Sequence, residues 1–113
     1  MRFIIPEIPP SLNQFAGREN EWAYRKAKAY WMELCCAYCR PKPVKPLERA
    51  RVTLEYHFPD RRRRDPDNYI KLIMDGLVKA GVIQDDSFDN VELVLKQGSA
   101  DKNPHVIIEI KEV

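Results

Sequence analysis

The stretch ARVTLEYHFPDRRRRDPDNYIKLIMDGLVKA, residues 50–80, decides the fold because its hydrophobic period changes halfway along. Over residues 50–58 apolar and polar side chains alternate, which predicts a half-buried strand. The predicted inner face of this strand consists of Val52, Leu54, Tyr56 and Phe58. Over residues 67–80 apolar side chains recur every three or four positions, which predicts a helix that Gly81 ends. The predicted inward stripe of this helix consists of Ile70, Ile73, Met74 and Leu77.

The flanking segments extend this strand–helix unit to the order β-α-β-α-β-β. They are a strand over residues 2–8 broken at Pro6, a helix over residues 19–40 stopped by Pro41, and strands over residues 91–97 and 105–113 joined by a hairpin-like turn. We expect an α+β fold, a single small domain over residues 1–113. Its mixed or antiparallel sheet is predicted to have two helices packed on one face.

The composition fits a globular protein, with 113 residues of which 44% are hydrophobic. No apolar run has the length that a membrane span needs, and the proline-containing N-terminus does not resemble a signal peptide. We therefore expect a cytoplasmic protein with reduced thiols. Its cysteines, Cys35, Cys36 and Cys39, lack the further ligands of a zinc site and are expected to be buried or to face a dimer partner.

The net charge of +2 conceals a strong asymmetry along the chain. Residues 1–64 hold 14 Lys and Arg against 7 Asp and Glu, a net of +7, whereas residues 65–113 hold 5 against 10, a net of −5. Blocks of opposite sign indicate a polyanion partner on one side and a cation on the other. The alternative is that both blocks are simply solvated.

Two carboxylates, Asp65 and Asp67, lie at the predicted start of the second helix. Helix capping alone could explain them, because Asp is favoured at the N-cap and Pro66 suits the first helical position. Asn68 could equally be only a turn residue. However, four arginines come directly before this pair, and adjacent positive charges repel one another unless an anion binds them. These arginines are Arg61, Arg62, Arg63 and Arg64.

A lysine and a second pair of carboxylates belong to the same region. Lys71 follows Asp67 by four residues, so the two are expected on one helix flank, where a routine surface salt bridge worth about 0–1 kcal/mol is the alternative. Asp85 and Asp86 follow the helix and could form a plain acidic turn. If the next strand pairs beside the strand of residues 50–58, Asp86 could return to the start of the helix.

Together, Asp65, Asp67 and Asp86 could form a metal site of oxygen ligands. Mg²⁺ prefers one or two carboxylates together with waters and substrate phosphate oxygens, and a pair of such ions can drive phosphodiester hydrolysis. Lys71 would balance the developing charge, and the arginines would hold the phosphate backbone. A DNA-binding protein without catalysis and a structural module with solvated charges are the alternatives.

The sequence resembles the RusA family of Holliday junction resolvases. The resemblance rests on FPDRRRRDPDN at residues 58–68, Lys71, DGLVKAG at residues 75–81, the pair Asp85 and Asp86, and PPSLNQ at residues 9–14. It implies a homodimer that binds four-way junctions or other branched DNA in recombination and repair. It further implies paired symmetric nicks that need Mg²⁺, for which Mn²⁺ can substitute, and a prophage origin.

The resemblance also implies roles for individual residues. Asp65, Asp67 and Asp86 match the essential acidic residues and Lys71 the essential lysine, while Arg64 matches a DNA-binding arginine. Asp75 matches a family aspartate that could be only structural, and Asp85 is a neighbour of lesser weight. The basic loop that the family has before the first helix is short here, with Arg18 nearly alone in it.

Two further groups of residues carry weaker expectations. His57 and His105 are expected to be ordinary strand histidines, without a partner that would make either a general base. The aromatic and basic residues of the first helix could stack bases, but core or dimer contacts for the aromatics and a DNA-facing side for the lysines are favoured. These residues are Trp22, Tyr24, Arg25, Lys26, Lys28, Tyr30 and Trp31.

Overall fold

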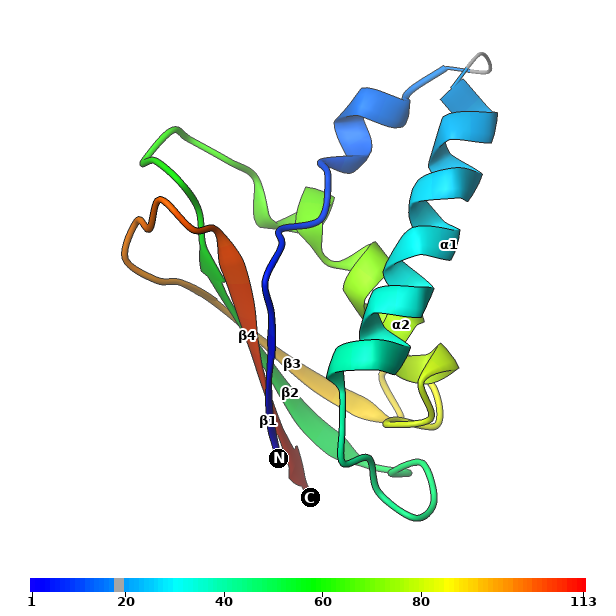
Figure 1. Cartoon of the computed structure of the whole chain (residues 1–113). Helices are drawn as coiled ribbons and strands as arrows, with labels where there is room; N and C mark the ends of the chain where they lie inside the picture. The colour runs from blue at the N-terminus through cyan, green and yellow to red at the C-terminus, as the bar shows by residue number, and fades with distance from the viewer. Residues whose placement is uncertain (18–19) are drawn as a thin grey trace.

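The computed structural model describes residues 1–17 and 20–113, so that the expected helix start at Glu19 and the role of Arg18 lie outside the described residues. Two helices cover one face of a four-stranded mixed sheet, which confirms the predicted fold class (Figure 1). In chain order the elements are β1 (Arg2–Ile5), the 3-10 turn η1 (Leu12–Phe15), α1 (Glu21–Tyr38), β2 (Ala50–His57), the 3-10 turn η3 (Pro66–Tyr69), α2 (Lys71–Lys79), β3 (Val91–Gln97) and β4 (His105–Glu112). In the parts of the chain that the structure describes, no helix combines the length and the apolar character needed to cross a bilayer.

The sheet has the strand order β1-β4-β2-β3, so the expected hairpin between the last two strands is wrong. β3 pairs parallel to β2, and β4 pairs antiparallel to β2 on its other edge and to β1. The connecting loop therefore crosses the end of β2. The Gly98 N–H donates to the Tyr56 carbonyl at 2.8 Å and the Asp101 N–H to the Phe58 carbonyl at 2.9 Å, which holds the loop in this crossing.

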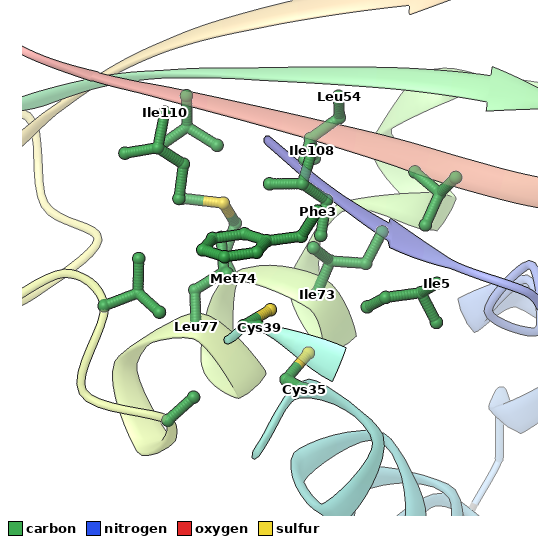
Figure 2. Packing of buried hydrophobic residues seen from close by; sticks show 14 of the residues in the cluster. Phe3, Ile5, Cys35, Cys39, Leu54, Ile73, Met74, Leu77, Ile108 and Ile110 are labelled. Atoms are coloured by element: carbon green, nitrogen blue, oxygen red, sulfur yellow. The ribbon is translucent and has the colours of Figure 1, made fainter. Parts of the chain in front are cut away.

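The core lies between the sheet and α2 (Figure 2). The predicted inner face of β2 is buried throughout, and it packs with side chains from β1 and β4 above the stripe of α2. Figure 2 labels the central members of this core, which are Phe3, Ile5, Cys35, Cys39, Leu54, Ile73, Met74, Leu77, Ile108 and Ile110. The periodicity of residues 50–80 thus predicted the buried face of β2 and the burial of Ile73, Met74 and Leu77 on α2, but it missed the buried Leu72, and Ile70 is only partly buried.

The aromatic side chains of α1 divide between the core and the surface. Trp22 is 72% exposed and Tyr30 is exposed as well, whereas Trp31 and Cys35 are buried. The reason is the close approach of α1 to α2 at Gly76, where an added Cβ would lie 2.3 Å from the Cys35 Sγ atom. The face of α1 with Trp31 and Cys35 packs against α2. Trp22 instead lies under the Lys26 ammonium, which is 5.1 Å from the centroid of the Trp22 ring.

The second helix begins at Lys71, four residues later than predicted. Residues 66–69 form the 3-10 turn η3, and the Tyr56 hydroxyl of β2 donates a 2.6 Å hydrogen bond to the Tyr69 carbonyl. This contact directs the carbonyl towards the sheet, so regular α-helical bonding begins with the Met74 N–H donating to the Ile70 carbonyl. Asp67 therefore lies on the turn before α2 rather than on the helix itself.

The end of α2 follows the prediction. Gly81 has a φ of 78°, the left-handed conformation that glycine adopts without strain. The Val82 N–H then donates back to the Leu77 carbonyl at 3.0 Å, which closes the helix. The chain is thereby redirected towards Asp85, Asp86 and β3.

Candidate active site

A groove of about 920 Å³ brings together three of the residues predicted for the site, Asp67, Lys71 and Asp86. Asp67 comes from η3, Lys71 from the first turn of α2, and Asp86 from the loop between α2 and β3. The remaining walls are largely apolar and include Leu12, Ile70, Met74, Phe88, Val91 and Leu93. Because β3 pairs parallel to β2, the loop that carries Asp86 returns to α2, as the sequence predicted.

Lys71 is the cationic member of this groove. Its ammonium donates a 3.2 Å hydrogen bond to the Asp75 Oδ1 atom, one turn further along α2. This bond raises the pKa of Lys71 above its usual value, and the charges of Asp75 and Asp86 act in the same direction. Lys71 is therefore protonated at neutral pH and can stabilise negative charge, but it cannot act as a base there.

Asp65 stands apart from the groove. Its side chain is 60% exposed and its Oδ1 atom lies 4.0 Å from the Arg63 Nε atom. It occupies the N-cap position of η3 but makes no capping hydrogen bond, so capping does not explain this residue. The role implied for Asp65 by the resemblance stays a prediction.

Three carboxylates line the groove, those of Asp67, Asp86 and Glu92, and Glu92 pairs with Arg51 at 3.2 Å. Asp67 and Asp86 fit a magnesium ion, which takes one or two carboxylates and fills its other positions with waters and phosphate oxygens. Within residues 1–17 and 20–113, no group of three or more His, Cys, Asp or Glu side chains is arranged to hold a metal ion. The structure thus brings Asp67 and Asp86 together but does not assemble a three-carboxylate site with Asp65.

The four arginines differ in their surroundings. Arg61, Arg62 and Arg63 are exposed, the last two to 80% and 93% of their side chains. Arg64 is only 12% exposed and donates to the Asp60 Oδ1 atom at 2.8 Å, with its guanidinium 4.3 Å from the Phe58 ring centroid. Arg64 therefore shapes the loop between β2 and η3, whereas the other three extend into solvent.

Asp60 completes the anchoring of this loop. Its carboxylate accepts from the Arg62 backbone N–H at 2.9 Å as well as from Arg64. The two hydrogen bonds, that from Arg62 first, lower the pKa of Asp60 below its usual value. The loop thus has a defined shape before any partner binds.

The residues of lesser weight have local structural contacts. The Asp85 Oδ1 atom accepts from the Asp86 N–H at 2.9 Å, which fixes the backbone next to the groove. The Asn68 N–H donates to the Asp65 carbonyl at 3.2 Å within η3, so Asn68 is at least a turn residue. Phe88, which the sequence reasoning did not single out, is fully exposed on the rim of the groove.

Sequence reasoning singled out Lys28 only as a DNA-facing lysine and did not predict its contact with α2, where its Nζ atom lies 3.7 Å from the Asp75 Oδ2 atom. The pattern of α1 offered no signal for this contact, because it depends on how the two helices cross. The cysteines behave as expected, since Cys35 and Cys39 are buried and all three thiols are free.

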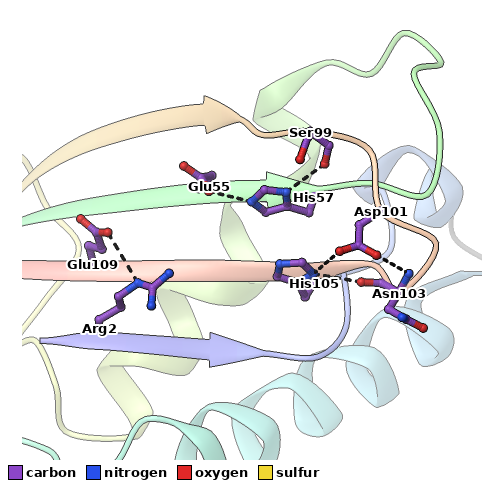
Figure 3. A network of polar contacts seen from close by, with 8 residues as sticks. All are labelled: Arg2, Glu55, His57, Ser99, Asp101, Asn103, His105 and Glu109. Atoms are coloured by element: carbon purple, nitrogen blue, oxygen red, sulfur yellow. Dashed lines mark hydrogen bonds and ion pairs between the residues drawn. The ribbon is translucent and has the colours of Figure 1, made fainter.

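Both histidines lie on strands, as expected, and the structure gives them contacts that the sequence did not predict (Figure 3). The register of β2 and β4 places His57 opposite His105, and their rings stack with centroids 4.5 Å apart. The His57 Nε2 atom lies 2.6 Å from the Glu55 Oε2 atom, and the Ser99 carbonyl lies 2.8 Å from its Nδ1 atom. This network comes from β2, β4 and the crossing loop and does not line the groove.

A groove lined by carboxylates and an ammonium, with a loop of exposed arginines shortly before it in the chain, is typical of proteins that act on the phosphate backbone of nucleic acids. The chain matches the family described as Endodeoxyribonuclease RusA over residues 8–111. It therefore belongs to the RusA family of endonucleases.

Individual relatives agree with this assignment. The crossover junction endodeoxyribonuclease rusA of Enterobacteria phage HK97 is 32% identical over 97 residues, which cover 82% of this chain and 80% of that protein. The proteins of the same name from Escherichia coli K12 and Enterobacteria phage 82 are 51% identical over 38 residues, covering 34% of this chain and 32% of each relative.

Proposed function

We propose that this enzyme is a magnesium-dependent, structure-specific endodeoxyribonuclease that resolves four-way DNA junctions by paired, symmetric nicks. The observation that carries the proposal is the groove that Asp67, Asp86 and Lys71 line together, with the exposed arginines shortly before it in the chain. The family membership supports the substrate class, because the relatives are named crossover junction endodeoxyribonucleases.

The metal would be held by Asp67 and Asp86, and Asp65, which precedes Asp67 by two residues but does not line the groove, stays a predicted third ligand. When bound, Mg²⁺ supplies an activated water and neutralises charge on the scissile phosphate. Mn²⁺, which accepts the same oxygen ligands, would substitute for it.

The other roles belong to the chain's own cations. The Lys71 ammonium keeps its proton and would stabilise the charge that develops on the phosphate oxygens. Arg61, Arg62 and Arg63 would bind the backbone of a junction arm, and Arg64 would support them by holding the loop against Phe58.

Paired nicks in strands of like polarity require two active sites related by a two-fold axis. We therefore propose a homodimer, since a two-fold dimer matches the symmetry of a four-way junction. The free thiols of Cys35, Cys36 and Cys39 agree with work in the reducing cytoplasm, in recombination and repair of host or prophage DNA.

Cleavage of an end-labelled synthetic four-way junction tests the proposal. Wild type should nick two strands symmetrically with Mg²⁺ and none with EDTA, and Asp67→Asn should bind the junction without nicking it. Asp89→Asn is the matched control, because Asp89 is an exposed carboxylate on the same loop as Asp86 but outside the groove. Junction binding without nicking under any divalent metal would instead define a DNA-binding protein without catalysis.

A further inference from the structure

We infer that Asp75 is a positioning residue, which holds the Lys71 ammonium at the groove and is itself fixed by Lys28 from the other helix. The inference rests on the proposed function, because Lys71 is assigned there to the scissile phosphate. It adds two residues to the machinery, neither of which lines the groove.

The Asp75 carboxylate lies between two lysines of different helices. Its Oδ1 atom accepts from the Lys71 ammonium at 3.2 Å, and its Oδ2 atom lies 3.7 Å from the Lys28 Nζ atom. The side chain of Asp75 is only 14% exposed, while those of Lys71 and Lys28 are partly in solvent. The Asp75 carboxylate thus links α1 and α2 through Lys28 and Lys71. The carboxylate is largely buried, whereas both lysines reach solvent.

The burial of Asp75 is costly for the fold. Its Oδ2 atom is buried and has no hydrogen-bond partner among the described residues, and Lys28 compensates it only through charge. A buried carboxylate with an unsatisfied oxygen is destabilising compared with an apolar side chain of the same size. Stability therefore does not explain why an acidic residue is present here, and a role in orienting Lys71 does.

Lys71 needs such an anchor because its side chain is long and half-exposed. A lysine–aspartate pair on an exposed helix surface is weak and leaves the ammonium mobile. Here Asp75 is held rigidly at the interface of the two helices, so one of the three donors of the ammonium is committed to it. The other two donors remain for phosphate oxygens next to Asp67 and Asp86.

The crossing of the helices explains how Lys28 reaches this position. Gly76 follows Asp75 directly, and its missing Cβ lets α1 approach so closely that the Trp31 carbonyl would be 3.2 Å from an added Cβ. Lys28 precedes Trp31 by three residues and Cys35 by seven, which places it on the same face of α1. The packing that buries Cys35 therefore also delivers a second positive charge to Asp75.

A double-mutant cycle on junction cleavage tests the inference. Asp75→Asn should lower kcat by about 100-fold, the loss typical of a misplaced catalytic group, with junction affinity unchanged. In a Lys71→Met background, Asp75→Asn should cause no further loss, because the two residues act as one unit. Lys28→Met should lower kcat and Lys28→Arg should restore it.

Lys111→Met is the matched control, since Lys111 is an exposed lysine of β4 outside the groove, and it should leave kcat unchanged. Wild-type kcat in Asp75→Asn, or losses from Asp75→Asn and Lys71→Met that multiply in the double variant, would overturn the inference. If Asp75→Asn fails to fold, Lys28→Met decides, and a wild-type kcat in that variant overturns the role of Lys28 and with it the bridge.

A metal-free measurement separates this inference from the proposed function. Thermal unfolding of the four proteins of the cycle in EDTA should show that the effects of Asp75→Asn and Lys71→Met on Tm are coupled. Independent effects on Tm would overturn the bridge even if the enzyme cleaves junctions. If wild type cleaves no junction, the proposed function fails, whereas coupled Tm effects would still support the contact itself.

Discussion

Replacing Arg62 and Arg63 together by alanine should weaken DNA binding and should also make the remaining binding less dependent on salt. Both side chains are almost fully exposed, and their partners are distant, with 3.6 Å from Arg62 Nε to Asp60 Oδ1 and 4.0 Å from Arg63 Nε to Asp65 Oδ1. Exposed pairs of this kind contribute only about 0–1 kcal/mol, so a phosphate can displace the carboxylates. Arg64 is excluded from the variant because its contacts with Asp60 and Phe58 are structural.

The magnitude follows from counting phosphate contacts. Each contact on duplex DNA contributes a slope of about −0.9 to log K against log salt, so two lost contacts reduce the slope by about 1.8. Between about 50 and 200 mM salt, the wild type should therefore lose about 12-fold more affinity than the double variant does. The midpoint of thermal unfolding should be unchanged, because neither side chain is packed.

Fluorescence anisotropy of a labelled four-way junction in EDTA, at several salt concentrations, measures both slopes. The matched control is Arg2→Ala with Arg51→Ala, which removes two exposed charges from β1 and β2. A double variant of Arg62 and Arg63 with the wild-type slope would refute the phosphate-contact reasoning. So would an equal loss of slope in the control, because net charge rather than the loop would then determine binding.

Three further predictions concern stability. Asp65→Ala should leave the Tm unchanged, because its side chain makes no capping bond, yet abolish junction nicking; a drop in Tm would restore the capping explanation. Gly76→Ala should lower the free energy of unfolding, measured in urea, by about 1–3 kcal/mol, because the new Cβ would lie 2.3 Å from the Cys35 Sγ atom. This loss should exceed the gain from the better helix propensity of alanine. A stabilised variant would show that the two helices can move apart at no cost. The hydrogen bond with Glu55 raises the pKa of His57, so its contribution to stability is complete below about pH 6.5 and is lost as the pH rises through the raised folded-state value. Between about pH 6 and pH 8, the Tm of the wild type should therefore fall further than the Tm of His57→Gln. Equal decreases would show that the His57–Glu55 pair does not make stability depend on pH.

Local periodicity was sufficient for the central strand and the second helix. The alternation of residues 50–58 predicted the buried face of β2, and the stripe of residues 67–80 predicted most of the buried side chains of α2, Leu72 excepted, because burial follows the geometric repeat of each element. The stop at Gly81 was equally local, since it depends on the conformation of one residue. The conjunction of carboxylates and Lys71 likewise predicted that Asp67, Lys71 and Asp86 would share one site, whereas Asp65 and the arginines do not line the groove.

Contacts between distant segments decided the rest. The Tyr56 hydroxyl on β2 donates a hydrogen bond to the Tyr69 carbonyl, and α2 therefore begins only at Lys71. As a result, Asp67 lies on a turn before the helix. The insertion of β4 between β1 and β2 is a property of the whole sheet, and it stacks two histidines that lie far apart in the chain. Which face α1 buries depends on the close approach at Gly76, and only that crossing places Lys28 beside Asp75. The amino-acid sequence by itself thus determined the helices and strands and the types of charged residue at the groove. Which charged side chains contact one another was decided by the packing of these elements, because such contacts have no periodic signal along the chain.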